Sequence, residues 1–115
     1  MESEIQSKMN IEGVVSAHWK DVSPKEMVHP GFSTRLLWQG PNGEKALIFA
    51  IAPGAVYPEI DIHLPGPEEI FVVSGIFCDG KNNYPEGSFI HNPAGSSHIP
   101  QSQDGCVLFV FFPQG

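Results

Sequence analysis

The sequence predicts an all-β fold, a sandwich or barrel of short strands. Twelve glycines and eleven prolines in 115 residues break the chain into brief segments. No window sustains the 3.6-residue apolar period of an amphipathic helix, whereas several apolar runs have the length of a strand. With 41% hydrophobic residues, the chain is expected to form one globular domain over residues 1–115, with residues 1–9 as a loosely ordered lead-in.

The first strands are predicted to form a hairpin. Apolar runs at 36–39 and 46–52 flank a turn built from Gly40, Pro41, Asn42 and Gly43, residue types that favour tight chain reversal. Further strands are expected at 56–63, 69–78, 88–92 and 106–112. The two glycine- and proline-rich segments between the later strands are expected to be loops.

Two of these strands are apolar on both faces. In 69–77, Ile70 and Val72 share one face while Phe71 and Val73 share the other, and 106–112 follows the same pattern. A strand buried on both sides needs two covering layers. The sequence therefore favours a homodimer, in which a second subunit supplies one layer; a second sheet of the same chain is the alternative.

Charge and composition exclude several classes of partner. Thirteen acidic and six basic residues give a formal net charge of −7, which opposes contact with nucleic-acid phosphates or an anionic membrane. The N-terminus lacks the basic start and apolar run of a secretory signal, and no apolar run approaches the roughly 20 residues of a membrane helix. A cytoplasmic protein with a small-molecule ligand or substrate is expected.

Four polar residues form a candidate site. Asp61 and His63, at positions i and i+2 of a predicted strand, share one face, and Glu68 follows a tight turn where the next strand begins. His98 follows a turn that Pro93 and Gly95 make rigid. The residues alone allow two interpretations. They are either ligands of one metal ion or only the solvated polar face of a strand.

Two segments then show a family resemblance. The segment from Gly54 to Gly75 resembles the first cupin motif, with Asp61 and His63 at its H-x-H pair and Glu68 at its glutamate. The segment from residue 87 to 102 resembles the second motif, G-x5-P-x-G-x2-H-x3-N. Its matching residues are Gly87, Pro93, Gly95 and His98, with Ser102 at the final asparagine.

The match extends to the ChrR-type cupins over about residues 18 to 112. This family includes the C-terminal cupin-like domain of ChrR anti-sigma factors and acetylacetone-cleaving dioxygenases. The resemblance implies a small double-stranded β-helix, the cupin or jelly-roll barrel. It also implies one divalent transition metal, Fe, Zn, Mn or Ni, bound at His63, Glu68 and His98, with Asp61 at the position of the family's fourth ligand. Nothing in the sequence resembles the zinc-binding N-terminal domain of ChrR.

Asp61 departs from the family pattern, which has histidine at that position. Two histidines and two carboxylates bring a divalent ion to a net charge of about zero, whereas three histidines and one glutamate leave about +1. A neutral site acidifies bound water less. In one interpretation Asp61 is a ligand; in the other its presence marks a site that has lost a histidine and binds no ion. Glu59 is a weaker alternative to Asp61.

Three functions are compatible with this sequence. The first is a metal-dependent oxygenase or related enzyme, such as a dioxygenase, acting on a small carbonyl or organic-acid compound. The second is a non-catalytic ligand-binding or sensor module like the C-terminal domain of ChrR. The third is a structural barrel without metal. His91 is expected to be a partly exposed strand residue, Tyr57 to pack or line the pocket mouth, and Cys78 and Cys106 to be free thiols.

Overall fold

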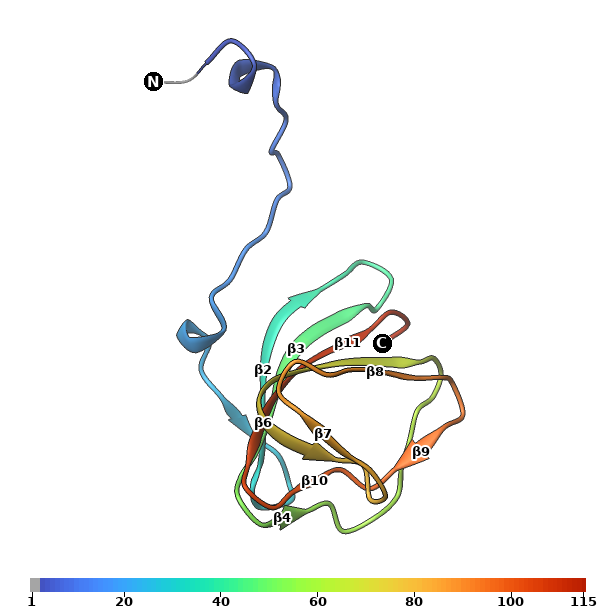
Figure 1. The fold of residues 1–115 in the computed structure, drawn as a ribbon. Helices are drawn as coiled ribbons and strands as arrows, with labels where there is room; N and C mark the ends of the chain where they lie inside the picture. Colours follow the sequence, from blue (N-terminus) through green and yellow to red (C-terminus); the bar gives the residue numbers. More distant parts are fainter. Residues whose placement is uncertain (1–2) are drawn as a thin grey trace.

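The computed structural model describes residues 3–115 and is built almost entirely from β-strands (Figure 1). The only helical elements among these residues are two single turns of 3-10 helix, η1 (Gln6–Lys8) and η2 (Trp19–Asp21). The strands in chain order are β1 (Lys25–Glu26), β2 (Phe32–Gln39), β3 (Lys45–Ile51), β4 (Ala55–Val56), β5 (Asp61–Ile62), β6 (Glu68–Cys78), β7 (Asn83–Pro85), β8 (Phe89–Asn92), β9 (Ser97–His98), β10 (Gln101–Ser102) and β11 (Cys106–Phe112).

The strands form one curled antiparallel sheet and one small separate pair. The main sheet runs in the order β1-β2-β3-β11-β6-β10-β4, with β7 and β8 also paired to β6, and the second sheet consists of β5 and β9. In Figure 1 the later strands curl round to face β2, β3 and β11. This confirms the expected all-β barrel. Strand β6 is its central element because it pairs with four other strands.

The predicted hairpin is confirmed as β2 and β3. Its turn is closed by the Gly40 N–H, which donates to the Glu44 carbonyl at 2.7 Å, and the Gly43 N–H, which donates to the Gly40 carbonyl at 3.3 Å. Strand β11 then pairs along the whole length of β3, from Cys106 opposite Ile51 to Phe112 opposite Lys45. The predicted strands at 69–78, 88–92 and 106–112 are also confirmed, each to within one residue.

The core lies on the concave side of the sheet. Alternation along β6 and β11 places Ile70, Val72, Leu108 and Val110 there, each at most 2% exposed. The other fully buried apolar residues of this core are Phe32, Ile51 and Phe77. Burial of these side chains provides the main hydrophobic stabilisation of the barrel.

The single strand expected at 56–63 is wrong. Strands β4 and β5 are separate two-residue strands, because Pro58 lies between them and has no N–H to donate to a ladder. Polar and apolar side chains nevertheless alternate along this segment, but the apolar ones are exposed and the polar His63 is buried. Ile60, Ile62 and Leu64 are 61%, 55% and 69% exposed, whereas His63 is 4% exposed. Asp61 and His63 therefore point toward the barrel interior, and the apolar side chains between and beside them face outwards.

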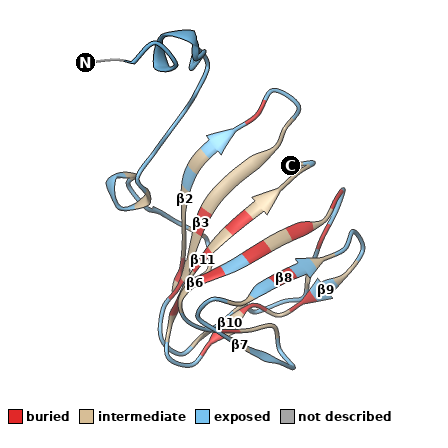
Figure 2. Cartoon of the chain, turned by 45° about the horizontal axis from the view of Figure 1, so that its top comes forward, coloured by how far each residue is buried: buried red, intermediate tan, exposed pale blue. Residues whose placement is uncertain are grey.

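The convex side of the sheet is apolar and only partly covered. Phe71 of β6 lies directly opposite Phe89 of β8, and these rings are 45% and 65% exposed. Figure 2 shows the alternation of buried and exposed residues along β6 beside the largely exposed β8. Near β2, the segment around Trp19 contacts this side, since the Arg35 guanidinium lies 5.0 Å from the Trp19 ring centroid. No second sheet of this chain covers Phe71 and Phe89 among residues 3–115.

The N-terminal segment lies outside the barrel, as Figure 1 shows. Residues 1–2 of the expected lead-in lie outside the described part of the chain, and the rest of it contains η1. Its larger apolar side chains, Ile5 and Met9, are exposed. None of the helices in residues 3–115 is long and apolar enough to cross a membrane.

Gly75 gives a direct test of the curled sheet. It has a φ of +78° and lies opposite Cys106, two residues from Val73, where the pairing of β6 with β11 shifts register. A Cβ on Gly75 would overlap the Gly105 carbonyl oxygen and lie 2.8 Å from Cys106 Cα. Gly75→Ala should lower the free energy of unfolding by roughly 2–5 kcal/mol in a urea titration, through backbone strain and overpacking.

Gly54→Ala is the matched control, because Gly54 has a similar φ of +81° but a Cβ there would meet no atom within 4 Å. Gly54→Ala should lower the free energy of unfolding by only about 1–2 kcal/mol, because it introduces backbone strain without overpacking. Equal losses in the two variants would show that the close approach of β6 to the Gly105 loop does not exist in solution.

Candidate metal centre

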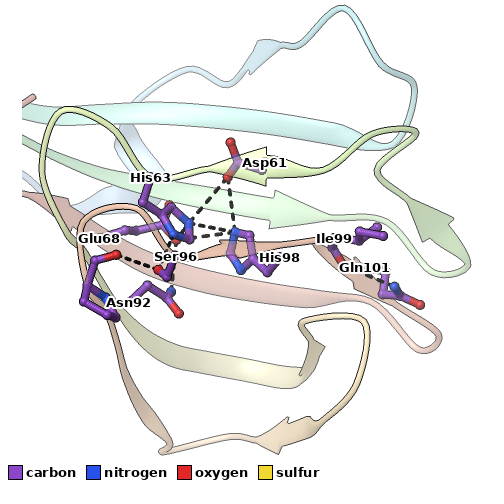
Figure 3. A network of polar contacts seen from close by, with 9 residues as sticks. Asp61, His63, Glu68, Asn92, Ser96, His98, Ile99 and Gln101 are labelled. Atoms are coloured by element: carbon purple, nitrogen blue, oxygen red, sulfur yellow. Dashed lines mark hydrogen bonds and ion pairs between the residues drawn. The ribbon is translucent and has the colours of Figure 1, made fainter.

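The four predicted site residues converge inside the barrel (Figure 3). One donor atom from each of Asp61, His63, Glu68 and His98 lies within 4.8 Å of the others. His63, Glu68 and His98 are buried, and Asp61 is intermediate. The solvated-face interpretation is therefore wrong for this cluster, since its side chains point inwards.

Backbone pairing brings the cluster together. Asp61 of β5 lies directly opposite His98 of β9. The same pairing continues past the strands, where the His63 N–H donates to the Ser96 carbonyl at 2.9 Å and the Gly95 N–H donates to the His63 carbonyl at 2.8 Å. Glu68 begins β6 on the neighbouring sheet. Three donors thus come from one short ladder and the fourth from the central strand.

The distances between donor atoms suit a first-row transition metal. The Nε2 atoms of His63 and His98 are 3.0 Å apart, and Glu68 Oε1 lies 3.0 Å and 3.6 Å from them. Asp61 Oδ2 lies 3.1 Å from His98 Nε2 and 3.6 Å from His63 Nε2. Tetrahedral ligands at 2.0–2.1 Å from zinc are about 3.3 Å from one another. The donor set and its spacing therefore fit a single ion.

Ser96 fixes the orientation and tautomer of His63. The Ser96 hydroxyl donates to the Pro93 carbonyl at 2.6 Å, so its oxygen accepts from the His63 Nδ1–H at 2.9 Å. The proton of His63 is thereby placed on Nδ1, and the Nε2 lone pair points into the cluster. Burial lowers the pKa of His63, and the adjacent His98 lowers it further, so the imidazole is neutral. Both conditions prepare a metal ligand.

Glu68 and His98 have different surroundings. Burial raises the pKa of Glu68 to about 7, against the effects of His98 and of the Asn92 amide, which donates to Glu68 Oε1 at 3.3 Å. His98 Nδ1 is buried without a hydrogen-bond partner among residues 3–115. The tautomer of His98 is therefore set only by its contacts within the cluster. For Glu68, a cation at the centre of the cluster would offset the cost of ionising the buried carboxyl group.

Other sequence candidates lie elsewhere. Glu59 is exposed and pairs with His29 at 3.4 Å, outside the cluster. His91 lies on the convex side of the sheet, where its Nδ1 is 2.6 Å from Glu69 Oε1, and its side chain is 54% exposed, as expected. Cys78 is a half-buried free thiol and Cys106 a buried one, which also confirms the expectation.

An apolar cavity of about 230 Å³ adjoins the cluster. Asp61, Glu68 and His98 form its polar wall, and Tyr57 also lines it. Burial raises the pKa of Tyr57, and the nearby Asp61 carboxylate raises it further, so its hydroxyl stays protonated and can donate a hydrogen bond. Tyr57 thus lines the pocket, and its ring also packs against the core, with its centroid 5.4 Å from that of Phe32.

Sequence reasoning missed the supporting roles of Ser96 and Asn92. In the sequence, Ser96 has neither a base nor an orienting group that would mark it as a nucleophile, and nothing else there distinguishes it. Its position two residues before His98 carried no signal for a contact with His63, which is 33 residues away. Asn92 could have been found from the strand register, because it lies opposite Glu68.

Comparison with known proteins agrees with this arrangement. The profile of a family described as "ChrR Cupin-like domain" matches residues 12–114. No curated protein matches the sequence significantly.

Several solved structures share the fold. An RmlC-like cupin from Shewanella frigidimarina has a TM-score of 0.73 at 17% identity, covering 87% of this chain and 90% of that chain. An acetylacetone dioxygenase from Acinetobacter johnsonii has a TM-score of 0.71 at 19% identity, with 92% and 76% covered. A chain from the Rhodobacter sphaeroides complex of SigE with the anti-sigma ChrR has a TM-score of 0.68 at 21% identity, covering 82% of this chain and 51% of that chain. At these identities the likeness establishes the fold alone.

Removal of the Ser96 hydroxyl tests its role behind His63. Ser96→Ala should weaken zinc binding by about 10–100-fold in a competitive chelator titration, because the His63 tautomer and ring orientation are no longer fixed. Ser97→Ala is the matched control, since Ser97 is exposed and makes no contact with the cluster. Equal affinities for the two variants and the native protein would contradict a role for Ser96.

Proposed function

The chain belongs to the ChrR cupin-like family, and on that premise we propose that it is a metal-binding cupin acting as a metal-dependent oxygenase or related enzyme. The ion is one divalent transition metal, Fe, Zn, Mn or Ni, with Asp61, His63, Glu68 and His98 as its ligands. The substrate is a small carbonyl or organic-acid compound. The whole chain acts as a single cupin domain.

The observation that carries this proposal is the convergence of two imidazoles and two carboxylates on one point beside a cavity. All four donor atoms lie within 4.8 Å of one another, and His63 presents an unprotonated Nε2. Burying the Glu68 carboxylate beside a second carboxylate, that of the partly exposed Asp61, is costly without a cation. A closed structural site would have no use for the adjoining apolar space, whereas a substrate site needs it.

The chain's own residues position and shield a substrate. A bound ion supplies Lewis-acid chemistry, and Fe(II) adds redox chemistry with O2. Leu108, Val110 and Phe77 give the cavity an apolar wall that disfavours water beside a bound substrate. The Tyr57 hydroxyl can donate to a substrate oxygen, and Ser96 holds His63 in place. Resemblance to dioxygenases supports this function by analogy of fold.

A sensor or ligand-binding module without catalysis is the second candidate. Two carboxylates bring a divalent ion to a net charge of about zero, which weakens its acidifying effect on water. The similarity in fold to a chain of the SigE–ChrR complex supports the same alternative. Metal binding is common to both candidates, and catalysis separates them.

Metal content is the first test. Protein purified without an affinity tag or added metal should contain about one first-row metal ion per chain by elemental analysis. Asp61→Ala should reduce that content and weaken metal binding, whereas Glu59→Ala should leave both unchanged, because Glu59 lies outside the cluster. Native protein that stays metal-free and binds no added metal would contradict both candidate functions.

Oxygen consumption then separates the candidates. Fe(II)-loaded protein supplied with β-diketones and keto acids should consume O2, and Asp61→Ala should abolish this consumption. A metal-loaded protein that consumes no O2 across such a panel would favour the sensor.

We also propose that two copies associate through the aromatic convex side of β6 and β8. Phe71 and Phe89 are exposed there, and an apolar patch of this kind marks an interaction surface. Beside them, Glu69 Oε2 is buried and has no hydrogen-bond partner among residues 3–115. A second copy would cover the rings and supply the missing donor.

A charged substitution tests this association. Phe89→Glu should convert a dimer into a monomer in sedimentation or light-scattering measurements, because a carboxylate cannot be buried against Phe71. Val56→Glu, at a residue 56% exposed on β4, should leave the dimer intact. A native protein that is monomeric at all concentrations would refute the proposed dimer.

A further inference from the structure

The cavity beside the cluster is lined mainly by apolar residues, and most of its polar residues belong to the cluster. Nine of its fourteen lining residues are Met, Leu, Ile, Val, Phe or Pro. Its charged or titratable groups, Asp61, Glu68 and His98, belong to the cluster, and its two neutral polar residues are Thr34 and Tyr57. A ligand can therefore make polar contacts only with the cluster, Tyr57 and Thr34. The rest of the cavity wall is suited to the hydrocarbon part of a ligand.

No lysine or arginine among residues 3–115 lines this cavity. Lys45 lines a separate hollow, which it shares with Asp61, His63 and Phe112 at the end of β3. An anion in the cavity would thus lie near two carboxylates and apart from any basic side chain. A divalent ion held by two carboxylates brings the cluster to a net charge of about zero, so it would remove this repulsion without supplying any net positive charge to attract an anion.

Burial of an unpaired carboxylate in an apolar space is strongly unfavourable, whereas a carbonyl oxygen needs only one hydrogen bond or one ligand position. Tyr57 and Thr34 both line the cavity, and each carries a hydroxyl that can donate to such an oxygen. The cavity volume of about 230 Å³ lies below the roughly 300 Å³ at which pockets for drug-sized ligands begin. The occupant must therefore be small.

We propose that the cavity selects a small, uncharged, mainly apolar molecule with one carbonyl-bearing end at the Asp61–Glu68–His98 wall, and that it discriminates against carboxylates. This inference rests on the proposed function and narrows its substrate class from carbonyl or acid to uncharged carbonyl compounds. Leu47, on the inner face of β3, contacts the apolar body of the ligand.

The test is a calorimetric titration with acetophenone and benzoate, which have similar size and shape but differ in charge. Acetophenone should bind at least about tenfold more tightly than benzoate, to both the metal-free and the zinc-loaded protein. Zinc is redox-inert, so binding is measured without turnover. Leu47→Phe, which fills the cavity, should weaken acetophenone binding at least about tenfold, whereas Leu36→Phe should not, because Leu36 is 50% exposed outside the cavity.

Benzoate binding as tight as acetophenone binding, or no binding of either probe, would overturn the proposal. If benzoate bound tightly and Lys45→Met removed that binding, the hollow at Lys45 would be an anion site and the charge assignment would be wrong. These outcomes are independent of the proposed metal function, because the comparison on metal-free protein stands even if no metal binds. Conversely, a metal-loaded protein that prefers benzoate would refute the selectivity alone. Both probes are compared on the native protein, so a Leu47→Phe variant that fails to fold leaves this part of the test intact.

Discussion

The convergence of two imidazoles and two carboxylates on one point, with only Asp61 partly exposed, is the constraint on which the structure depends. Such groups are costly to remove from water unless they are paired or bind a cation. The chain meets this cost with a short ladder between β5 and β9 and with the first residue of β6. Ser96 and Asn92 stabilise the arrangement from behind, by a hydrogen bond to His63 and to Glu68 respectively.

This arrangement determines which side chains reach solvent. Because Asp61 and His63 point inwards, their neighbours Ile62 and Leu64 must point outwards, and both are largely exposed. The interior that remains is an apolar cavity with a single polar wall. The convergence of the four donor side chains and the apolar lining of the adjoining cavity thus both follow from the alternation of side chains along the strands.

The sequence predicted the strands whose signal is local. The hairpin of β2 and β3 follows from its turn residues, and β6 and β11 follow from continuous apolar runs. The prediction of one strand over 56–63 was wrong, because the alternating pattern continues through Pro58, which has no N–H to donate to a strand ladder. The four site residues were identified by their spacing and by resemblance to the cupin motifs. The contact of Ser96 with His63 was not predictable, because it depends on a loop that returns over 33 residues.

The central claim is that Asp61, His63, Glu68 and His98 hold one metal ion, and the X-ray absorption spectrum of the metal-loaded protein tests it most directly. The account predicts multiple scattering from two imidazole rings and a first shell completed by oxygen atoms, at least one of which is lost in Asp61→Ala. A shell of oxygen atoms without imidazole scattering, or a spectrum unchanged in that variant, would contradict it.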